Sequence, residues 1–396
     1  MKEFGKAIRG EWLLDEDVIF LNHGSFGACP RPVLAVQREW QERMEAEPVR
    51  FMTRELPEHL EASRAELATF VGSRAEDLVF VQNATDGANA VLRSLLPTFK
   101  PGDELLTSSH AYRAVRQTMV YVAALSGATV VDADVPFPIK DQDEVVEAIA
   151  RSITPKTAFA VIDHITSPTG LIFPIAQVIE VFKERGIPVL IDGAHAPGQV
   201  ELNLDTLGAD YYVGNCHKWL YAPKGAALLW VDRKHQSKIH PTVISHFLGG
   251  GYQTEFAWTG TLDPTAFLSV PAGIEFHKKL AAHGSREYTQ RMLLDARSDI
   301  SAALGVSLAA PPDMLANLCT IPLPGNPDAT EERALHLHDV LFDEYRIEIP
   351  AMNANGKLCV RASSQVYNHP SDFNALKQAL VDLSGAAPVI GKAISQ

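Results

Sequence analysis

The feature that most constrains the fold is a regular alternation of apolar runs with amphipathic helical patterns between residues 57 and 231. Apolar runs predict strands at residues 78–81, 104–108, 129–132, 157–163, 188–192, 211–214 and 225–231. Helical patterns occupy residues 58–71, 86–96, 114–126, 141–150 and 175–185. Apolar strands between helices are typical of sheets covered on both faces. We therefore predict an α/β fold with a mainly parallel seven-stranded sheet, with ligand sites at the carboxyl ends of its strands.

The pattern changes near residue 265, where a helix-rich stretch over 266–304 leads to short strands and helices. This change predicts a large domain over residues 21–265 and a smaller α+β C-terminal domain over residues 266–396. Residues 1–20 are predicted to pack on the small domain, and the residues from Gly385 onward to form a loose tail.

Charge and cysteine content exclude several classes of function. The chain carries 35 basic and 48 acidic residues, a formal charge of −13, which disfavours nucleic acid as a partner. No run of about 18 apolar residues is present, so no membrane span is expected. The four cysteines form no CxxC pair, which argues against a zinc site or a disulfide framework. With a charged N-terminus that lacks an apolar signal region, the chain is predicted to be cytoplasmic.

Two strand ends carry residues suited to catalysis. Asp192 ends the apolar run IPVLID, and His195 follows three residues later. A buried carboxylate needs a cationic or hydrogen-bonding partner, such as a pyridinium N–H, although a helix cap or a turn would also explain Asp192. Lys218 follows the strand over 211–214 and stands before Trp219. Burial would lower the pKa of this lysine and free its amine for imine chemistry, whereas a surface lysine is the simpler alternative.

Three further segments could complete a ligand site. FVQNATDGANA (80–90) runs from a strand into a helix whose N-terminus could bind phosphate, with Thr85 adding a hydroxyl; an ordinary capped helix has the same pattern. LCVRASSQVY (358–367) places Arg361 on a short strand, where it could bind a carboxylate or form a surface salt bridge. FLNHGSFG (20–27) could line a ligand site or form a simple loop.

Together, the order and spacing of these segments resemble the class V aminotransferase-like group of fold type I enzymes, which depend on pyridoxal 5′-phosphate (PLP), and most of all its isopenicillin N epimerase-like branch. The stretches that carry the resemblance are LNHGSFGACP (21–30), VRFMTREL (49–56), QNATDGAN (82–89), SSHAYRAV (108–115), DHITSPTGLIFPI (163–175), IDGAHAPGQ (191–199), GNCHKWLYAPKG (214–225), FAWTGTLDPTAFL (256–268) and VRASSQVYN (360–368).

The resemblance implies a role for each site residue. Lys218 would form the Schiff base with PLP, Asp192 would pair with the pyridine nitrogen, and His195 would bind the phenolic oxygen. His110 would stack on the ring and complete the catalytic set with Lys218 and Asp192; Tyr112 is an alternative for the stacking. The remaining implied contacts are Ala84, Thr85, His217 and Thr261 of the partner subunit for the phosphate, Ser167 near the phenolic oxygen, and Arg361, Asn22, His23, Arg50 and Tyr112 for the substrate.

The implied protein is a homodimer with shared active sites that acts at the amine and Cα of an amino acid, by epimerisation or racemisation. A C–S β-lyase or an aminotransferase is the alternative, and a catalytically silent PLP-fold binding protein is an alternative of another class. A dinucleotide-binding oxidoreductase is disfavoured because no G-x-G-x-x-G follows the early strands. A cysteine desulfurase is disfavoured because Cys359, two residues before Arg361, lies on a predicted strand rather than a mobile loop. Arg50 and Arg54 favour a substrate with a polar or acidic side chain.

Overall fold

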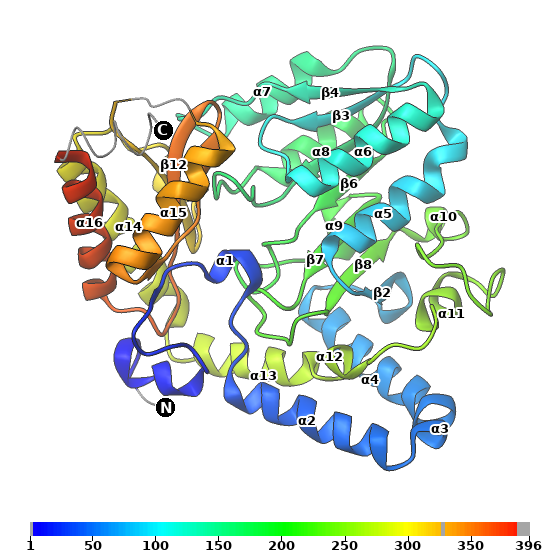
Figure 1. The fold of residues 1–396 in the computed structure, drawn as a ribbon. Helices are drawn as coiled ribbons and strands as arrows, with labels where there is room; N and C mark the ends of the chain where they lie inside the picture. The colour runs from blue at the N-terminus through cyan, green and yellow to red at the C-terminus, as the bar shows by residue number, and fades with distance from the viewer. Residues whose placement is uncertain (1–2, 326–328, 386–396) are drawn as a thin grey trace.

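A computed structural model describes residues 3–325 and 329–385 of the chain, so the tail predicted beyond Gly385 lies outside the described residues. Its centre is a seven-stranded sheet with the strand order β2-β8-β7-β6-β5-β3-β4 (Figure 1). The strands are β2 (Leu78–Val81), β3 (Glu104–Ser108), β4 (Thr129–Ala133), β5 (Thr157–Asp163), β6 (Val189–Asp192), β7 (Tyr211–Asn215) and β8 (Ala227–Val231). Strands β4, β3, β5, β6 and β7 pair in parallel, whereas β8 is antiparallel to both β7 and β2. The predicted mainly parallel seven-stranded sheet is confirmed.

Alternate residues of each strand face two separate apolar layers. On β2, Val79 and Val81 belong to the layer that contains α5 and α6, whereas Leu78 and Phe80 belong to the layer that contains α7 and α8. The helices around the sheet are α4 (Leu56–Phe70), α5 (Ala84–Leu95), α6 (Arg113–Ser126), α7 (Asp143–Ser152), α8 (Ile175–Lys183), α9 (Leu204–Leu207) and α10 (Arg233–Gln236). The near-continuous burial of these strands follows from helices on both faces.

A second group of elements lies to one side of the central sheet in Figure 1. Its three-stranded antiparallel sheet has the order β11-β12-β9 and is covered by long helices. The bounds are α14 (Ser285–Leu304), β9 (Leu318–Pro322), α15 (Glu331–Tyr345), β10 (Ile347–Glu348), β11 (Ala351–Ala354), β12 (Lys357–Ser363) and α16 (Pro370–Gly385). This arrangement is the smaller α+β region expected from the sequence, and the exact domain boundaries stay predictions.

Helices near both boundaries connect the two groups of elements. They are α1 (His23–Phe26), α2 (Arg31–Ala46), α3 (Pro48–Arg50), α11 (Tyr252–Ala257), α12 (Thr265–Leu268) and α13 (Val270–Ala281). Helices α12 and α13 pack against α2 and α4, so the chain leaves the large sheet gradually before α14 begins.

The N-terminal segment lies against the C-terminal elements. The N–H of Gly5 donates to Val366 O at 2.7 Å, and Ile8 and Trp12 are buried in a cluster with Tyr367. Strand β1 (Ile19–Phe20) pairs in parallel with β10. Within the described part of the chain, no helix is both long enough and apolar enough to cross a membrane.

Candidate active site

The carboxyl ends of neighbouring parallel strands bring several polar side chains together. Strand β5 ends at Asp163, β6 at Asp192 and β7 at Asn215, and all three side chains are buried. The turn that follows β7 carries Lys218, and the turn that follows β6 carries His195. This edge of the sheet is where an open α/β fold usually binds its ligand.

Two carboxylates lie side by side at this edge. Asp163 and Asp192 are partners in the register of β5 and β6, and their residues are only 4% and 2% exposed. The backbone N–H of Ala194 donates to Asp192 Oδ1 at 3.0 Å, and the N–H of Tyr112 donates to the Asp163 carboxylate. Burial raises the pKa of Asp192, and burial together with the charge of Asp192 raises the pKa of Asp163 well above its usual range.

Lys218 is enclosed by the turn after β7 and is 9% exposed. Its Nζ lies 3.2 Å from His195 Nε2. Burial, aided by the charge of Arg361 and opposed by that of Asp192, lowers the pKa of Lys218 to about 7. At neutral pH a large fraction of this amine is therefore uncharged and able to act as a nucleophile or base.

The hydrogen bonds of His195 define its tautomer. Trp219 Nε1 can only donate, and it donates to His195 Nδ1 at 3.3 Å. Burial lowers the pKa of His195 well below its usual value, so the neutral ring carries its proton on Nε2, which faces Lys218 Nζ. In this structure His195 therefore contacts the lysine, and its predicted contact with the phenolic oxygen of PLP stays a prediction.

His110 is buried in the loop after β3, with both ring nitrogens engaged. Val135 O accepts from Nε2 at 3.0 Å, and Thr169 Oγ1 lies 2.7 Å from Nδ1. Because the carbonyl can only accept, Nε2 carries the proton and Nδ1 accepts from Thr169. Burial also lowers the pKa of His110. The ring is thus neutral and fixed, which suits stacking by a ring face more than proton transfer through a nitrogen.

The predicted phosphate contacts surround the N-terminus of α5. Asn83 caps this helix by accepting from the N–H of Asp86 at 2.9 Å, and the N–H of Ala84 donates to Asn215 Oδ1 at 2.8 Å. Thr85 is half-buried in the first turn of the helix. The helix starts at Ala84 rather than at residue 86 because Asn83 supplies the cap.

The other two predicted phosphate ligands lie on loops. His217 is half-buried, and its Nδ1 donates to Ala226 O at 2.9 Å. Burial lowers the pKa of His217 to about 4, so its ring is neutral. Thr261 is exposed on the loop between α11 and α12. The phosphate roles of His217 and Thr261 stay predictions.

Arg361 projects from β12 and is 4% exposed. Its Nη1 donates to Ser167 O at 2.7 Å and to Ser167 Oγ at 3.2 Å, and its Nη2 donates to Ser25 Oγ at 3.0 Å. Its Nε is buried without a hydrogen-bond partner. Burial lowers the pKa of Arg361 to about 10, so the side chain stays charged at neutral pH. A buried guanidinium held only by neutral groups is well suited to a ligand carboxylate.

Two residues predicted to contact the substrate, His23 and Asn22, form hydrogen bonds with other groups of the protein. His23 is buried, with Nδ1 2.9 Å from the Tyr367 hydroxyl and Nε2 3.0 Å from Lys218 O. Asn22 Nδ2 donates to Glu348 Oε1 at 2.7 Å. These contacts favour a supporting role for His23 and Asn22, in which they hold α1 and the Lys218 turn in place.

Arg50 and Tyr112 are both accessible, but only Tyr112 lies close to Arg361. Arg50 Nε pairs with Glu55 at 2.9 Å, and the Arg50 side chain is 64% exposed on α3. Its partner is thus a neighbour in the chain rather than Lys218 or Arg361. Tyr112 is 41% exposed and acts electrostatically on Arg361. Of these two predicted substrate contacts, the structure groups Tyr112 with Arg361.

Gly27 allows α1 to approach the Lys218 turn closely. Its φ of +70° lies in the left-handed region, and a Cβ on Gly27 would stand 2.2 Å from His217 O and 2.8 Å from Lys218 Cα. Any other residue would displace the turn that carries the lysine.

Sequence reasoning missed Asp163, Asn215, Ser25 and Thr169, although all four lie in or beside the quoted stretches. Asp163 had a detectable signal, because it ends an apolar strand in the same way as Asp192. Ser25 had none, because its contact with Arg361 joins residues 336 positions apart.

The thiols do not resemble nucleophiles. Cys216 and Cys359 are fully buried, and burial raises the pKa of Cys359 to about 12. Such thiols are protonated at neutral pH and inert. Among the described residues, no group of three or more histidine, cysteine or acidic side chains could hold a metal ion.

The family model for aminotransferase class-V matches residues 19–376. The chain is 30% identical over 393 residues to the probable L-cysteine desulfhydrase, chloroplastic, of Arabidopsis thaliana, which covers 92% of this chain and 83% of that protein. It is 32% identical over 393 residues to isopenicillin N epimerase of Amycolatopsis lactamdurans, covering 94% and 96% of the two chains. Apo cysteine desulfurase from Thermococcus onnurineus NA1 has a TM-score of 0.80 at 19% identity, covering 97% and 99% of the chains.

Proposed function

The chain belongs to the aminotransferase class-V family and is a PLP-dependent enzyme, and from that premise we propose that it catalyses β-elimination from an amino acid, as a C–S lyase does. Its substrate would carry a sulfur-containing leaving group on Cβ. The single observation that carries this proposal is that Lys218 is a buried amine whose pKa is lowered to about 7 and whose Nζ lies against the neutral His195 ring, which leaves the amine available as a base.

The donor set fits the cofactor. Asp192 is a buried carboxylate with no protein cation within ion-pair distance among the described residues, which suits a pyridinium N–H. In the first turn of α5 the N–H groups of Ala84 and Asp86 have partners within the protein, so Thr85 is the residue there that would offer its N–H and hydroxyl to a phosphate. The Lys218 amine suits an aldehyde. When bound, PLP withdraws electrons from Cα of an amino acid joined to it through the amine.

Lys218 and Arg361 would have separate roles toward the substrate. Arg361 would bind the α-carboxylate through the guanidinium edge that the serines leave free, and its buried, hydrogen-bonded position would fix the substrate's orientation. The uncharged amine of Lys218 would remove the Cα proton as general base. The leaving group then departs from Cβ with its bonding electrons, so one base is sufficient.

Epimerisation needs a second proton donor on the face of Cα opposite Lys218, and the structure supports few candidates. The nitrogens of His23 are both engaged, and the Tyr221 hydroxyl is buried and donates to Gln365 Oε1 at 2.7 Å. The Tyr112 side chain is accessible and interacts electrostatically with Arg361. Epimerase or racemase activity with Tyr112 as the second acid is therefore the second candidate function.

We extend the proposal to a homodimer. Val243, Ile244, Phe247 and Leu248 are 48–61% exposed on the segment before α11, and an exposed apolar patch of this kind is typical of a protein interface. Thr261 follows α11 on an exposed loop, which supports its predicted reach to the phosphate of the partner's site. A cytoplasmic location belongs to the same proposal, because all four cysteines are free thiols.

One assay separates the candidate reactions. The purified enzyme is incubated in heavy water with L-cysteine and with S-substituted cysteines, and pyruvate, released thiol and Cα exchange are followed. Pyruvate with an equal amount of thiol supports the C–S lyase. Exchange with inversion and no keto acid would instead establish the epimerase, and a Tyr112→Phe variant should then lose inversion.

A keto acid formed with transfer of the amine to the cofactor identifies an aminotransferase. A protein that binds PLP but shows none of these reactions, even with a broad set of amino acids, is the silent binding protein. Either result overturns the proposed elimination.

A further inference from the structure

The two carboxylates at the ends of β5 and β6 are unusual in being both buried and adjacent. Asp163 and Asp192 are register partners on parallel strands, so their side chains leave the same face of the sheet. Both residues are less than 5% exposed. Among residues 3–325 and 329–385, neither carboxylate has a lysine, arginine or histidine nitrogen within 4 Å.

Several of the described elements at this edge of the sheet carry charged or titratable groups. These groups are His164 after β5, His195 after β6, Tyr212 on β7, Lys218 after β7, Arg361 on β12, and His110 and Tyr112 before α6. Burial lowers the pKa of all three histidines, so they are neutral. Lys218 acts electrostatically on Asp192, whereas no cation in the described part of the chain acts on Asp163.

We propose that Asp163 and Asp192 hold one proton between them, that this proton resides on Asp163, and that Asp163 thereby acts as a positioning residue that keeps Asp192 charged for the ring nitrogen of PLP. The inference rests on the proposed role of Asp192 and deepens it.

The sharing of a proton follows from the placement of the pair. Two negative charges in one buried site repel each other strongly, which favours a proton on one of the two carboxyls. The negative charge is more stable on Asp192, because Lys218 faces it and the N–H of Ala194 donates to it. One oxygen of Asp163 can accept from the N–H of Tyr112 while the other carries the proton.

A protonated Asp163 has a consequence for the cofactor. If Asp163 were ionised, its charge would raise the proton affinity of Asp192, which would then compete with the ring nitrogen for a proton. A neutral Asp163 prevents this competition and can donate a hydrogen bond to Asp192. The N–H contact to Tyr112 also fixes the loop that carries His110.

A protonated Asp163 and an ionised Asp163 predict opposite effects of replacing this residue by an uncharged one. Asp163→Asn keeps an amide donor and an acceptor without any charge, as the protonated acid does. Asp163→Ala removes both groups. We expect Asp163→Asn to keep the wild-type PLP affinity within about twofold, whereas Asp163→Ala weakens PLP binding roughly tenfold. The pH dependence of the holoenzyme's visible band should be unchanged in the asparagine variant and shifted in the alanine variant.

Infrared spectroscopy of the PLP-free protein locates the proton directly. The C=O band of a protonated carboxyl, identified by its shift in heavy water, should be present at neutral pH in the wild type and absent in Asp163→Asn. Asp77→Asn is the matched control, because Asp77 is equally buried but bound to arginines, and it should leave the band in place.

Two results would overturn the inference: a band that persists in Asp163→Asn, or a PLP affinity as poor in Asp163→Asn as in Asp163→Ala. If Asp163→Ala does not fold, the band and the asparagine variant still decide. Failure of the proposed function is a separate outcome, since PLP bound away from Lys218 would leave the infrared band unaffected.

Discussion

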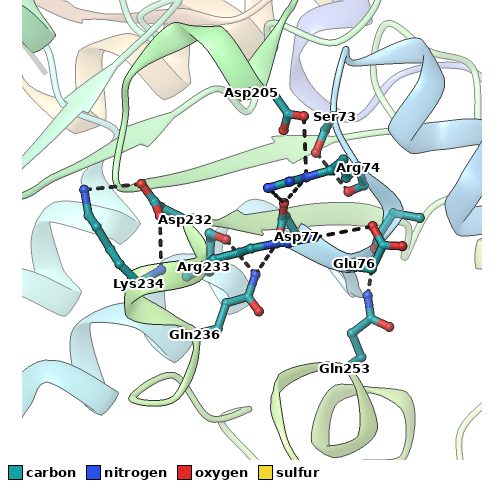
Figure 2. Close-up of polar contacts among 12 residues, drawn as sticks. Ser73, Arg74, Glu76, Asp77, Asp205, Asp232, Arg233, Lys234, Gln236 and Gln253 are labelled. Atoms are coloured by element: carbon teal, nitrogen blue, oxygen red, sulfur yellow. Dashed lines mark hydrogen bonds and ion pairs between the residues drawn. The ribbon is translucent and has the colours of Figure 1, made fainter.

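Two regions of this protein bury carboxylates in opposite ways. At the amino-terminal edge of the sheet, Asp77 precedes β2 and lies between two arginines (Figure 2). Arg74 Nη2 and Arg233 Nε lie 2.8 and 3.0 Å from its oxygens, and Gln236 Nε2 donates to it at 2.8 Å. At the carboxyl-terminal edge, no cation of the described residues lies within ion-pair distance of Asp163 or Asp192. The cations of that region, Lys218 and Arg361, contact neutral groups instead.

The difference separates a structural cluster from a site built for a ligand. Around Asp77 the charges neutralise one another, and nothing further is needed to stabilise them. At the opposite edge, charges of both signs are buried and held apart, which costs stability unless a ligand supplies the missing partners. A cofactor ring nitrogen and a substrate carboxylate are the partners that we propose for Asp192 and Arg361.

The largest expected effect comes from removing the charge of Asp192. Asp192→Asn should lower kcat/KM at least about 100-fold, because the charge that faces the cofactor ring is lost. Asp77→Asn should leave kcat/KM within about twofold, since Asp77 lies at the other edge of the sheet. Steady-state kinetics on both variants test this contrast. Equal losses in the two variants would show that the two regions do not differ in function.

Removing the Asp77 carboxylate should instead change the free energy of unfolding. Asp77→Asn leaves Arg74 and Arg233 without their shared carboxylate and should lower the free energy of unfolding by about 2 kcal/mol. The loss is limited because both arginine side chains are 54% exposed and can turn toward water. Asp205→Asn, which removes an exposed contact 3.9 Å from Arg74, is the control and should cost less than about 0.5 kcal/mol. Urea unfolding measures all three proteins.

A third change makes the active site resemble the Asp77 cluster. Ser25→Asp would place a carboxylate next to Arg361 Nη2, so Arg361 would be paired before the substrate arrives. We expect KM to rise about tenfold, whereas Ser25→Ala, which removes one hydrogen bond, should raise KM only about threefold. Initial rates over a range of substrate concentrations distinguish the two. An unchanged KM in Ser25→Asp would mean that Arg361 does not bind the substrate carboxylate.

The smallest expected effect is a pH dependence of stability in the PLP-free protein. Burial and Asp192 raise the pKa of Asp163, so the folded state holds a proton that the unfolded chain releases above about pH 4. This contribution is fully present below about pH 4 and is lost as the pH rises toward the raised pKa, at up to about 1.4 kcal/mol per pH unit. Asp163→Asn should lack this slope. Urea unfolding at several pH values measures it, and equal slopes in the two proteins would contradict the raised pKa.

Much of the fold could be predicted because the strands of the large sheet are short, apolar and buried on both faces. The strands over residues 78–81, 104–108 and 157–163 have the predicted bounds. Helix ends were displaced by a few residues where a cap decides the boundary, as Asn83 does for α5. The pairing of β1 with β10 joins residues more than 300 positions apart, which no local pattern reveals.

The site was only partly predictable, for a related reason. Lys218, Asp192 and Arg361 occur in recognisable stretches, and the structure brings all three to one region. Their supporting contacts depend on tertiary packing, as in the binding of Arg361 by Ser25 and Ser167. The structure pairs Arg50 with Glu55, and His23 with Tyr367 and the Lys218 backbone, and the substrate contacts expected for Arg50 and His23 stay predictions.

The central claim is that Lys218 is the residue that binds PLP covalently, and one measurement tests it most directly. The PLP-loaded protein is reduced with borohydride, digested, and analysed by mass spectrometry for the lysine that carries the reduced cofactor. We predict loss of the visible band and a single modified peptide that contains Lys218, with no modification in Lys218→Ala. A modified lysine elsewhere, or an unchanged visible band in Lys218→Ala, would contradict the account.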